Sequence, residues 1–135
     1  MKTASEIIGE MAAEHASRQQ SAAEVLKMLD WLFEQLNSTE VSVKFNGLDI
    51  YRVSEVRDGQ IVDGHDVRVQ RYGRLLCELT PSNIGVWVIP EDRRLVEHCW
   101  DGERALRRVL EILRADFVMR PQDDRELYEP EPARI

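Results

Sequence analysis

The chain has 135 residues, a net charge of −7 at pH 7 and a hydrophobic fraction of 43%. This length is typical of one domain, and the apolar content is sufficient for an ordinary core without a stabilising metal or disulfide. The acidic balance disfavours direct nucleic-acid binding, which normally needs a basic surface, and it suits contact with a basic protein.

Neither a membrane segment nor a secretion signal is predicted. No apolar run approaches the roughly 18 residues that span a bilayer, and the first residues lack the apolar stretch of a signal peptide. We therefore expect a cytoplasmic protein. In that reducing compartment Cys77 and Cys99 are expected to be buried free thiols, because free cysteine packs like a small hydrophobic residue. A disulfide between neighbouring strands is the alternative.

Residues 4–37 contain no proline and many strong helix formers. Their second half predicts an amphipathic helix, because apolar residues recur there at three- and four-residue spacing: Val25, Leu26, Leu29, Leu32, Phe33 and Leu36. Ser21, with Glu24 three residues later, is a candidate cap for this half.

The first half of this region continues the apolar stripe less regularly, through Ile7, Ile8, Met11 and His15. Polar residues then interrupt it at 18–20. The region is therefore either one long helix with a polar middle or two helices that meet near residue 20.

From residue 41 the apolar period changes to two, which indicates strands. A strand at 41–45, the turn-forming pair Asn46-Gly47 and a strand at 48–56 predict a hairpin. Further turn signals separate strands at 60–72, 75–79, 85–89 and 95–100. Asp63-Gly64 is either a bulge or a short turn. Such short connections predict an antiparallel meander of five or six strands.

Asp101 is a candidate cap for a C-terminal helix that ends near Pro121. Its apolar stripe comprises Leu106, Val109, Leu110, Leu113 and Phe117. Residues 121–135 are acidic and contain proline, which predicts an extended or disordered tail. The predicted fold is a single α+β domain over residues 1–120, with an N-terminal helical region, an antiparallel meander, and a C-terminal helix packed on the sheet.

The motifs of common enzyme classes are absent from the sequence: no glycine-rich phosphate loop, nucleophile elbow or zinc-binding helix motif can be written. Asp63, His65 and Asp66 are the densest group that could hold a metal or relay a proton, and they are the basis of an alternative hypothesis, a small metal-dependent enzyme. Because neighbouring strand residues point to opposite faces, we favour a turn followed by a solvated strand. No catalytic residue, metal or cofactor is assigned.

A dyad of cysteine and histidine is the second chemical possibility. His98 and Cys99 should point to opposite faces, whereas Cys77 opposite His98 on a neighbouring strand is possible but not indicated. We favour core and surface roles for these residues.

The C-terminal helix has a basic face that could bind phosphate or an acidic partner: Arg104, Arg107, Arg108 and Arg114. Glu103 and Glu111 each lie four residues from Arg107, which favours ordinary ion pairing on a solvated surface.

The second face of the sheet is the main candidate for binding. Val86 and Val88 should point one way while Trp87 and Ile89 point the other, so both faces are apolar here. Three further residues are at positions where they could join Trp87: Tyr51, Tyr72 and Leu76. If both helices covered one face, this patch would be exposed, as interaction sites are. We favour helices on opposite faces, with Trp87 in the core.

The leading functional prediction is a non-enzymatic protein-binding module of the inhibitor, immunity or chaperone kind. In size, acidity and layout the chain resembles small bacterial accessory proteins, among them secretion chaperones, immunity proteins and phage-encoded inhibitors, without a diagnostic motif. A variant of this prediction is nucleic-acid mimicry, in which Glu6, Glu10 and Glu14 enter a partner's basic groove. A structural homodimer through the N-terminal helix is a further alternative.

Overall fold

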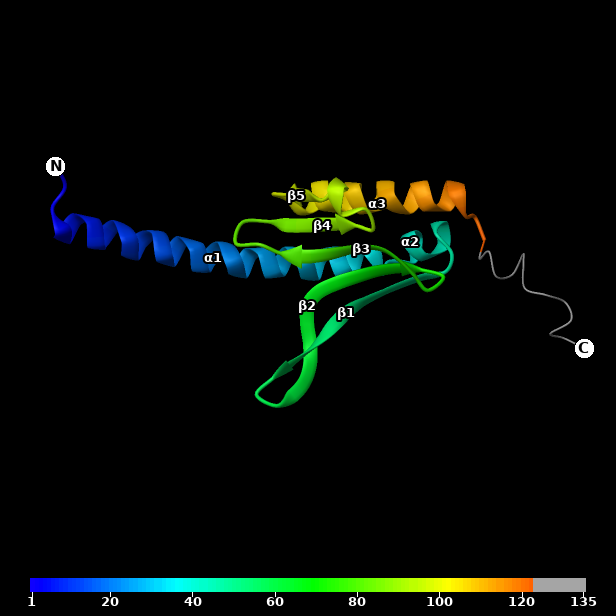
Figure 1. Ribbon diagram of the computed structural model, residues 1–135, viewed down its shortest axis with the longest axis horizontal. Helices are drawn as coiled ribbons and strands as arrows, with labels where there is room; N and C mark the ends of the chain where they lie inside the picture. Colours follow the sequence, from blue (N-terminus) through cyan, green and yellow to red (C-terminus); the bar gives the residue numbers. More distant parts are fainter. Residues whose placement is uncertain (123–135) are drawn as a thin grey trace, which may run out of the picture.

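The computed structural model describes residues 1–122, except for the side chains of residues 15–21. It confirms the α+β fold (Figure 1). The helices are α1 (Ala4–Leu36), α2 (Thr39–Lys44) and α3 (Gly102–Met119), with a 3₁₀ helix, η1, at Arg93–Leu95. The strands are β1 (Leu48–Arg57), β2 (Gln60–Arg71), β3 (Arg74–Pro81), β4 (Val86–Pro90) and β5 (Glu97–Cys99). They form one antiparallel sheet in chain order. From residue 123 onward, the predicted tail lies outside the described residues.

Both long helices pack on the same face of the sheet (Figure 1). Helix α1 contacts β1, β2 and β3, α3 contacts β3, β4 and β5, and the two helices contact each other. The expectation that they cover opposite faces is therefore wrong. The physical reason is that two narrow helical stripes, placed side by side, are needed to cover one face of a five-stranded sheet.

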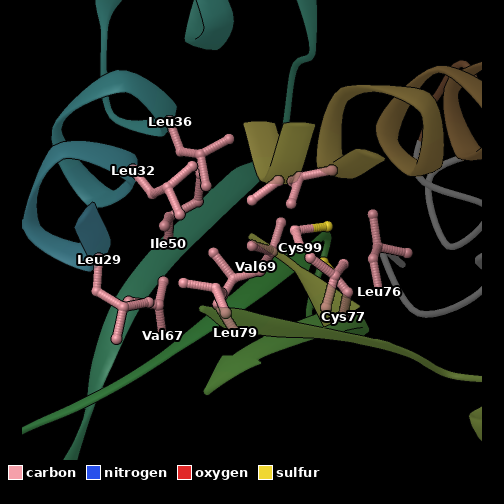
Figure 2. Packing of buried hydrophobic residues seen from close by; sticks show 14 of the residues in the cluster. Leu29, Leu32, Leu36, Ile50, Val67, Val69, Leu76, Cys77, Leu79 and Cys99 are labelled. Carbon is pink, nitrogen blue, oxygen red and sulfur yellow. The ribbon is translucent and has the colours of Figure 1, made fainter. Parts of the chain in front are cut away.

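The core lies between the sheet and the two long helices, and side chains from both sides fill it (Figure 2). Strands β1 to β5 contribute Ile50, Val67, Val69, Cys77, Leu79, Val86, Val88 and Cys99. The helices contribute Val25, Leu29, Leu32, Leu36, Ala105, Val109 and Leu113. The predicted stripes of α1 and α3 thus supply the core, although Phe117 is 36% exposed and belongs to its edge.

Helix α1 is continuous, which decides between the one-helix and two-helix alternatives. Its cap is Thr3, whose side chain accepts a hydrogen bond from the Glu6 amide at 3.3 Å, so Ser21 does not start a separate helix. Residues 1–14 are all exposed, and the first buried residue is Val25. The N-terminal half projects from the body of the molecule (Figure 1). Residues 4–14 of this projection are called the arm below.

The segment 39–44 is helical, and the predicted strand at 41–45 is wrong. Val41 and Phe45 are four residues apart, a spacing that suits a helix as well as a strand. Phe45 is buried and its ring meets that of Phe117 edge to face, whereas Val43 is 77% exposed. Asn46-Gly47 consequently leads from a helix into β1 and joins no hairpin, although Gly47 does adopt a positive φ of 76°.

The remaining turn signals are confirmed. Asp58-Gly59 and Tyr72-Gly73 each place two consecutive residues at positive φ, as two-residue hairpin turns require. A bulge follows Asp63: this residue pairs with Ser54, yet the next paired residue of β2 is Val67, opposite Arg52. Strand β5 is shorter than predicted: η1 includes Leu95, and only Glu97–Cys99 pair with β4.

A buried arginine joins β2 to the end of α3, which sequence analysis did not anticipate. The Arg71 side chain is fully buried and forms an ion pair with Asp116, with 3.0 Å between Nη1 and Oδ2. It also donates to the backbone carbonyl and side-chain oxygen of Asn46, each at 2.7 Å, and to the carbonyls of Arg120 and Pro121. These contacts use all five donors of the guanidinium.

Candidate functional site

The face of the sheet opposite α1 and α3 is called the outer face. Its side chains form rows across the strands. One row comprises Tyr51, Arg68, Glu78 and Ile89 on β1 to β4. The next comprises Thr80, Trp87 and His98 on β3 to β5. No helix of residues 1–122 contributes to this face, so it is open to solvent.

Aromatic rings gather at the β4–β5 end of the outer face. The Trp87 and His98 ring centroids are 4.5 Å apart, and those of His98 and Trp100 are 5.6 Å apart with an edge-to-face orientation. Trp87 is 39% exposed and Trp100 is 65% exposed. Ile89 lies two residues from Trp87 and therefore points the same way. These four residues are called the aromatic patch.

The loop between β3 and β4 holds His98 in place. Ser82 Oγ lies 2.7 Å from His98 Nε2 and also accepts hydrogen bonds from the amides of Ile84 and Gly85, at 3.3 and 2.9 Å. Gly85 is required here, because a Cβ would lie 3.0 Å from the imidazole Cε1 and closer still to the Cys99 carbonyl. The Ser82 hydroxyl thus orients the imidazole between the two indole rings.

Tyr51 lies on the outer face but apart from the aromatic patch. It is in the same row as Ile89, at the other end, and the ion pair of Arg68 with Glu78 lies between them, with 2.8 Å from Nε to Oε1. The Tyr51 hydroxyl accepts a hydrogen bond from Gln70 at 3.0 Å. Charged side chains therefore divide the apolar surface that the sequence predicted.

Tyr72 and Leu76 also lie apart from Trp87. Tyr72 is in the β2–β3 turn, where its hydroxyl accepts a hydrogen bond from Asn46 and its ring packs beside the Arg71 guanidinium. Leu76 is 6% exposed and belongs to the core cluster. The register shift between Val69 and Gln70 places an extra residue in β3 here, which breaks the simple alternation of faces. Of the five predicted residues, only Trp87 and Ile89 come together.

His98 and Trp100 belong to the aromatic patch, although the sequence pattern did not predict them as part of the binding surface. His98 lies beside Trp87 because these two residues are paired between β4 and β5. The sequence does not specify this pairing, because the length of the connection between the two strands does not determine their register. Trp100 follows the end of β5, where alternation no longer applies.

The acidic residues Glu6, Glu10 and Glu14 all lie on the arm and are exposed. Their four-residue spacing places them along one side of the helix. Glu10 pairs with Lys2, with 2.5 Å between Oε1 and Nζ. On the same arm, Ile7, Ile8 and Met11 are 45%, 66% and 61% exposed.

The cluster of Asp63, His65 and Asp66 lies at the bulge of β2, between the paired residues Asp63 and Val67. No group of three or more metal-binding side chains is arranged to hold an ion within residues 1–122, side chains 15–21 aside. Partial burial raises the pKa of Asp66 above its ordinary value, and the nearby carboxylates of Glu78 and Glu55 add to this effect.

The two cysteines are free and buried, as predicted. Both point to the core side of the sheet, whereas His98 points to the outer face, so a dyad between Cys77 and His98 is excluded by the geometry. Burial raises the pKa of Cys77 to about 12, and it also raises that of Cys99, with a further contribution from Glu97.

The basic face of α3 divides into two parts. Arg104 and Arg108 lie near Glu97 of β5, at 3.4 and 3.8 Å, whereas the expected pairs of Arg107 with Glu103 and Glu111 are not among the ion pairs of the described residues. Arg107 and Arg114 instead border a groove of about 570 Å³ between α2 and α3, called the α2–α3 groove. Val41, Phe45, Leu106 and Leu110 supply its apolar lining.

The rim of the α2–α3 groove carries both signs of charge. Lys44, Arg107 and Arg114 supply the cations, and none of the ion pairs found in the described part of the chain includes them. The anions are Glu40, Glu103 and Glu111. Glu111 also lies 3.6 Å from Arg108.

Comparisons with models of protein families, with curated proteins and with solved structures found no match to this chain. Among the described residues, no helix has the length and apolar character needed to cross a membrane. The surfaces described above are therefore the features of the chain that bear on its function.

Proposed function

We propose that the chain is a non-enzymatic protein-binding module and that the aromatic patch is its contact surface. The observation that carries this proposal is the exposure of Trp87 on β4 and of Trp100 just after β5, 39% and 65%, beside His98 on a sheet face open to solvent. Tryptophan is among the residues that contribute most binding energy in protein interfaces. Its exposure in a contiguous apolar patch is typical of a surface that a partner covers.

The surroundings of the patch suit protein recognition. Strand β4 is hydrogen-bonded on both sides, so Trp87 and Ile89 are held without a loop having to become ordered on binding. Arg68 and Glu78 border the apolar residues and would form a polar rim. A small acidic module with one such patch fits a stoichiometric inhibitor, immunity protein or chaperone.

The proposal is tested by capture of a partner from a lysate of the native host, with the tagged chain as bait and mass spectrometry for identification. Trp87→Ala and Trp100→Ala are each expected to lower the affinity for the captured protein at least tenfold, about 1.4 kcal/mol. Trp31→Ala is the matched control, because Trp31 is 37% exposed but lies on α1. Circular dichroism establishes that each variant is folded.

Equal capture of the same protein by folded Trp87→Ala and Trp100→Ala variants would contradict the proposal. If only Trp31→Ala lowered the affinity for the captured protein, the contact surface would lie on the helical side of the sheet.

A further inference from the structure

We infer that the arm of one copy docks in the α2–α3 groove of a second copy, so that the chain forms a homodimer by exchange of arms. This inference concerns surfaces other than the aromatic patch and does not depend on the proposed function.

The arm carries apolar residues that its own body leaves uncovered. Ile7, Ile8 and Met11 continue the stripe that faces the core further along α1, yet about half of each side chain or more is exposed. An isolated helix of this length is marginally stable in water. A helical segment that projects from the body is therefore stabilised when it packs against a partner. Met11 lies four positions after Ile7 and three after Ile8, the spacings found in helices that bind in grooves.

The arm cannot reach the groove of its own copy. Helix α1 is continuous from Ala4 to Leu36 and carries the arm away from the body (Figure 1). About ten residues separate the arm from Val25, the first buried residue, a rise of about 15 Å along the axis. Folding back would break the helix in this stretch, and a second copy therefore supplies the occupant.

The α2–α3 groove matches the apolar side of the arm. Leu106 and Leu110 are half-buried, and their four-residue spacing equals that of Ile7 and Met11. Two helices with apolar residues at this spacing can pack side by side over one turn of about 5.4 Å. Phe45 closes the bottom of the groove at 4% exposure.

The charges of the two surfaces are also complementary in position. Glu6 and Glu14 are eight residues apart, about 12 Å along α1, while Arg107 and Arg114 are seven apart, about 10.5 Å along α3. Lys44 adds a third cation on the α2 side of the groove. The acidic rim residues Glu40, Glu103 and Glu111 offset the three cations in net charge, so apolar contact supplies the affinity and the positions of the charges fix the register.

Reciprocal exchange closes the assembly. Each copy offers one arm and one groove, so a twofold axis satisfies both contacts at once without leaving a free arm.

Sedimentation velocity of the full chain over a range of concentrations tests the inference. The unmodified chain is expected to be a dimer in equilibrium with monomer. Reversal of the groove charges (Arg107→Glu with Arg114→Glu) or of the arm charges (Glu6→Arg with Glu14→Arg) is expected to raise the dimer Kd at least tenfold. Both reversals in one chain should restore the dimer, because the pairs are then re-formed with opposite signs.

The matched control reverses two exposed arginines away from the groove, Arg74→Glu with Arg93→Glu, and should leave the Kd unchanged. As a second measurement, Met11→Cys with Leu110→Cys should form disulfide-linked dimers on mild oxidation, since both native cysteines are buried. A monomer at all concentrations would overturn the inference. So would a dimer that tolerates either reversal, or one that the combined reversal fails to restore.

Discussion

Arg71 of β2 and Asp116 of α3 form an ion pair in the interior, 45 positions apart in the chain and 3.0 Å apart between Nη1 and Oδ2. The same guanidinium binds Asn46, which precedes β1, and the carbonyls that end α3. One side chain therefore fixes the first strands against the last helix. The rings of Tyr72 and Phe117, with centroids 5.0 and 5.2 Å from the guanidinium carbon, shield it from water.

Arg71→Met is expected to lower the free energy of unfolding by about 3–5 kcal/mol, because the buried Asp116 carboxylate would keep only the partly exposed Arg120, 2.7 Å away, and the two oxygens of Asn46 would lose their donor. Urea titration followed by circular dichroism measures the change. Arg74→Met, in the next strand and exposed, is the control and should change stability by less than about 0.5 kcal/mol. Combining Arg71→Met with Asp116→Leu should recover part of the loss. Equal stability of Arg71→Met and Arg74→Met would show that the pair contributes nothing.

Two glycines with the same backbone conformation should differ in their tolerance of alanine. Gly47 and Gly73 both have φ of 76°, so alanine costs about 1 kcal/mol at either position from backbone strain. At Gly47 a Cβ would also lie 2.6 Å from two ring atoms of Tyr72, whereas the space around Gly73 is open. Gly47→Ala should therefore destabilise by about 1–3 kcal/mol more than Gly73→Ala in the same titration. Equal losses would place the Tyr72 ring elsewhere.

The pH dependence of stability should carry a contribution from Asp66. Its folded pKa lies above the ordinary value of 3.8, because of burial and then of Glu78 and Glu55. The folded state then binds the proton more tightly than the unfolded state, so this group's contribution becomes unfavourable as the pH rises from 3.8 through the folded pKa. The destabilisation by ionised Asp66 is fully present at neutral pH.

Asp66→Asn should accordingly raise stability at pH 7, by less than about 1 kcal/mol because the site is exposed and screened. The gain should disappear near pH 3, where the native carboxyl is protonated in both states. Thermal unfolding at the two pH values measures it, with Asp63→Asn as the control for removal of a neighbouring charge. A gain of the same size at pH 3 would show that charge is not the cause.

The two thiols should be unreactive in the folded protein. Both are buried, and the Cys77 pKa of about 12 leaves almost no thiolate at pH 8. A disulfide reagent followed by absorbance should titrate two thiols in guanidinium and react far more slowly without it. Rapid reaction of either cysteine in the folded chain would show that the sheet and α3 separate readily.

Much of the fold could be predicted from local sequence. Asp58-Gly59 and Gly73 mark turns whose geometry is set by adjacent residues, and the stripe of Leu29 and Leu32 identifies the buried side of α1 without knowledge of the partner. These features follow from short-range sterics and from the helical period, so they can be predicted from a few neighbouring residues. The exception is the segment at Val41, where the four-residue spacing to Phe45 fits both a helix and a strand.

The candidate site depended instead on tertiary choices that no local pattern specifies. Whether Trp87 is core or surface was decided by the side of the sheet on which α3 packs. Strand register determines the neighbours of Trp87. The β4–β5 register places His98 beside Trp87, and the bulge in β3 directs Leu76 into the core. The pairing of Arg71 with Asp116 joins distant segments and has no signature in spacing.

The strand order also bears on the synthesis of the chain. Every strand pairs with the next one along the chain, so each hairpin can form as soon as its second strand has left the ribosome. The inward residues of β4 and β5, Val86, Val88 and Cys99, are covered by α3, which is translated after all of them. Until the residues up to Leu113 emerge, the nascent chain holds an apolar strip open to the solvent, and this interval is when the protein is most vulnerable to aggregation.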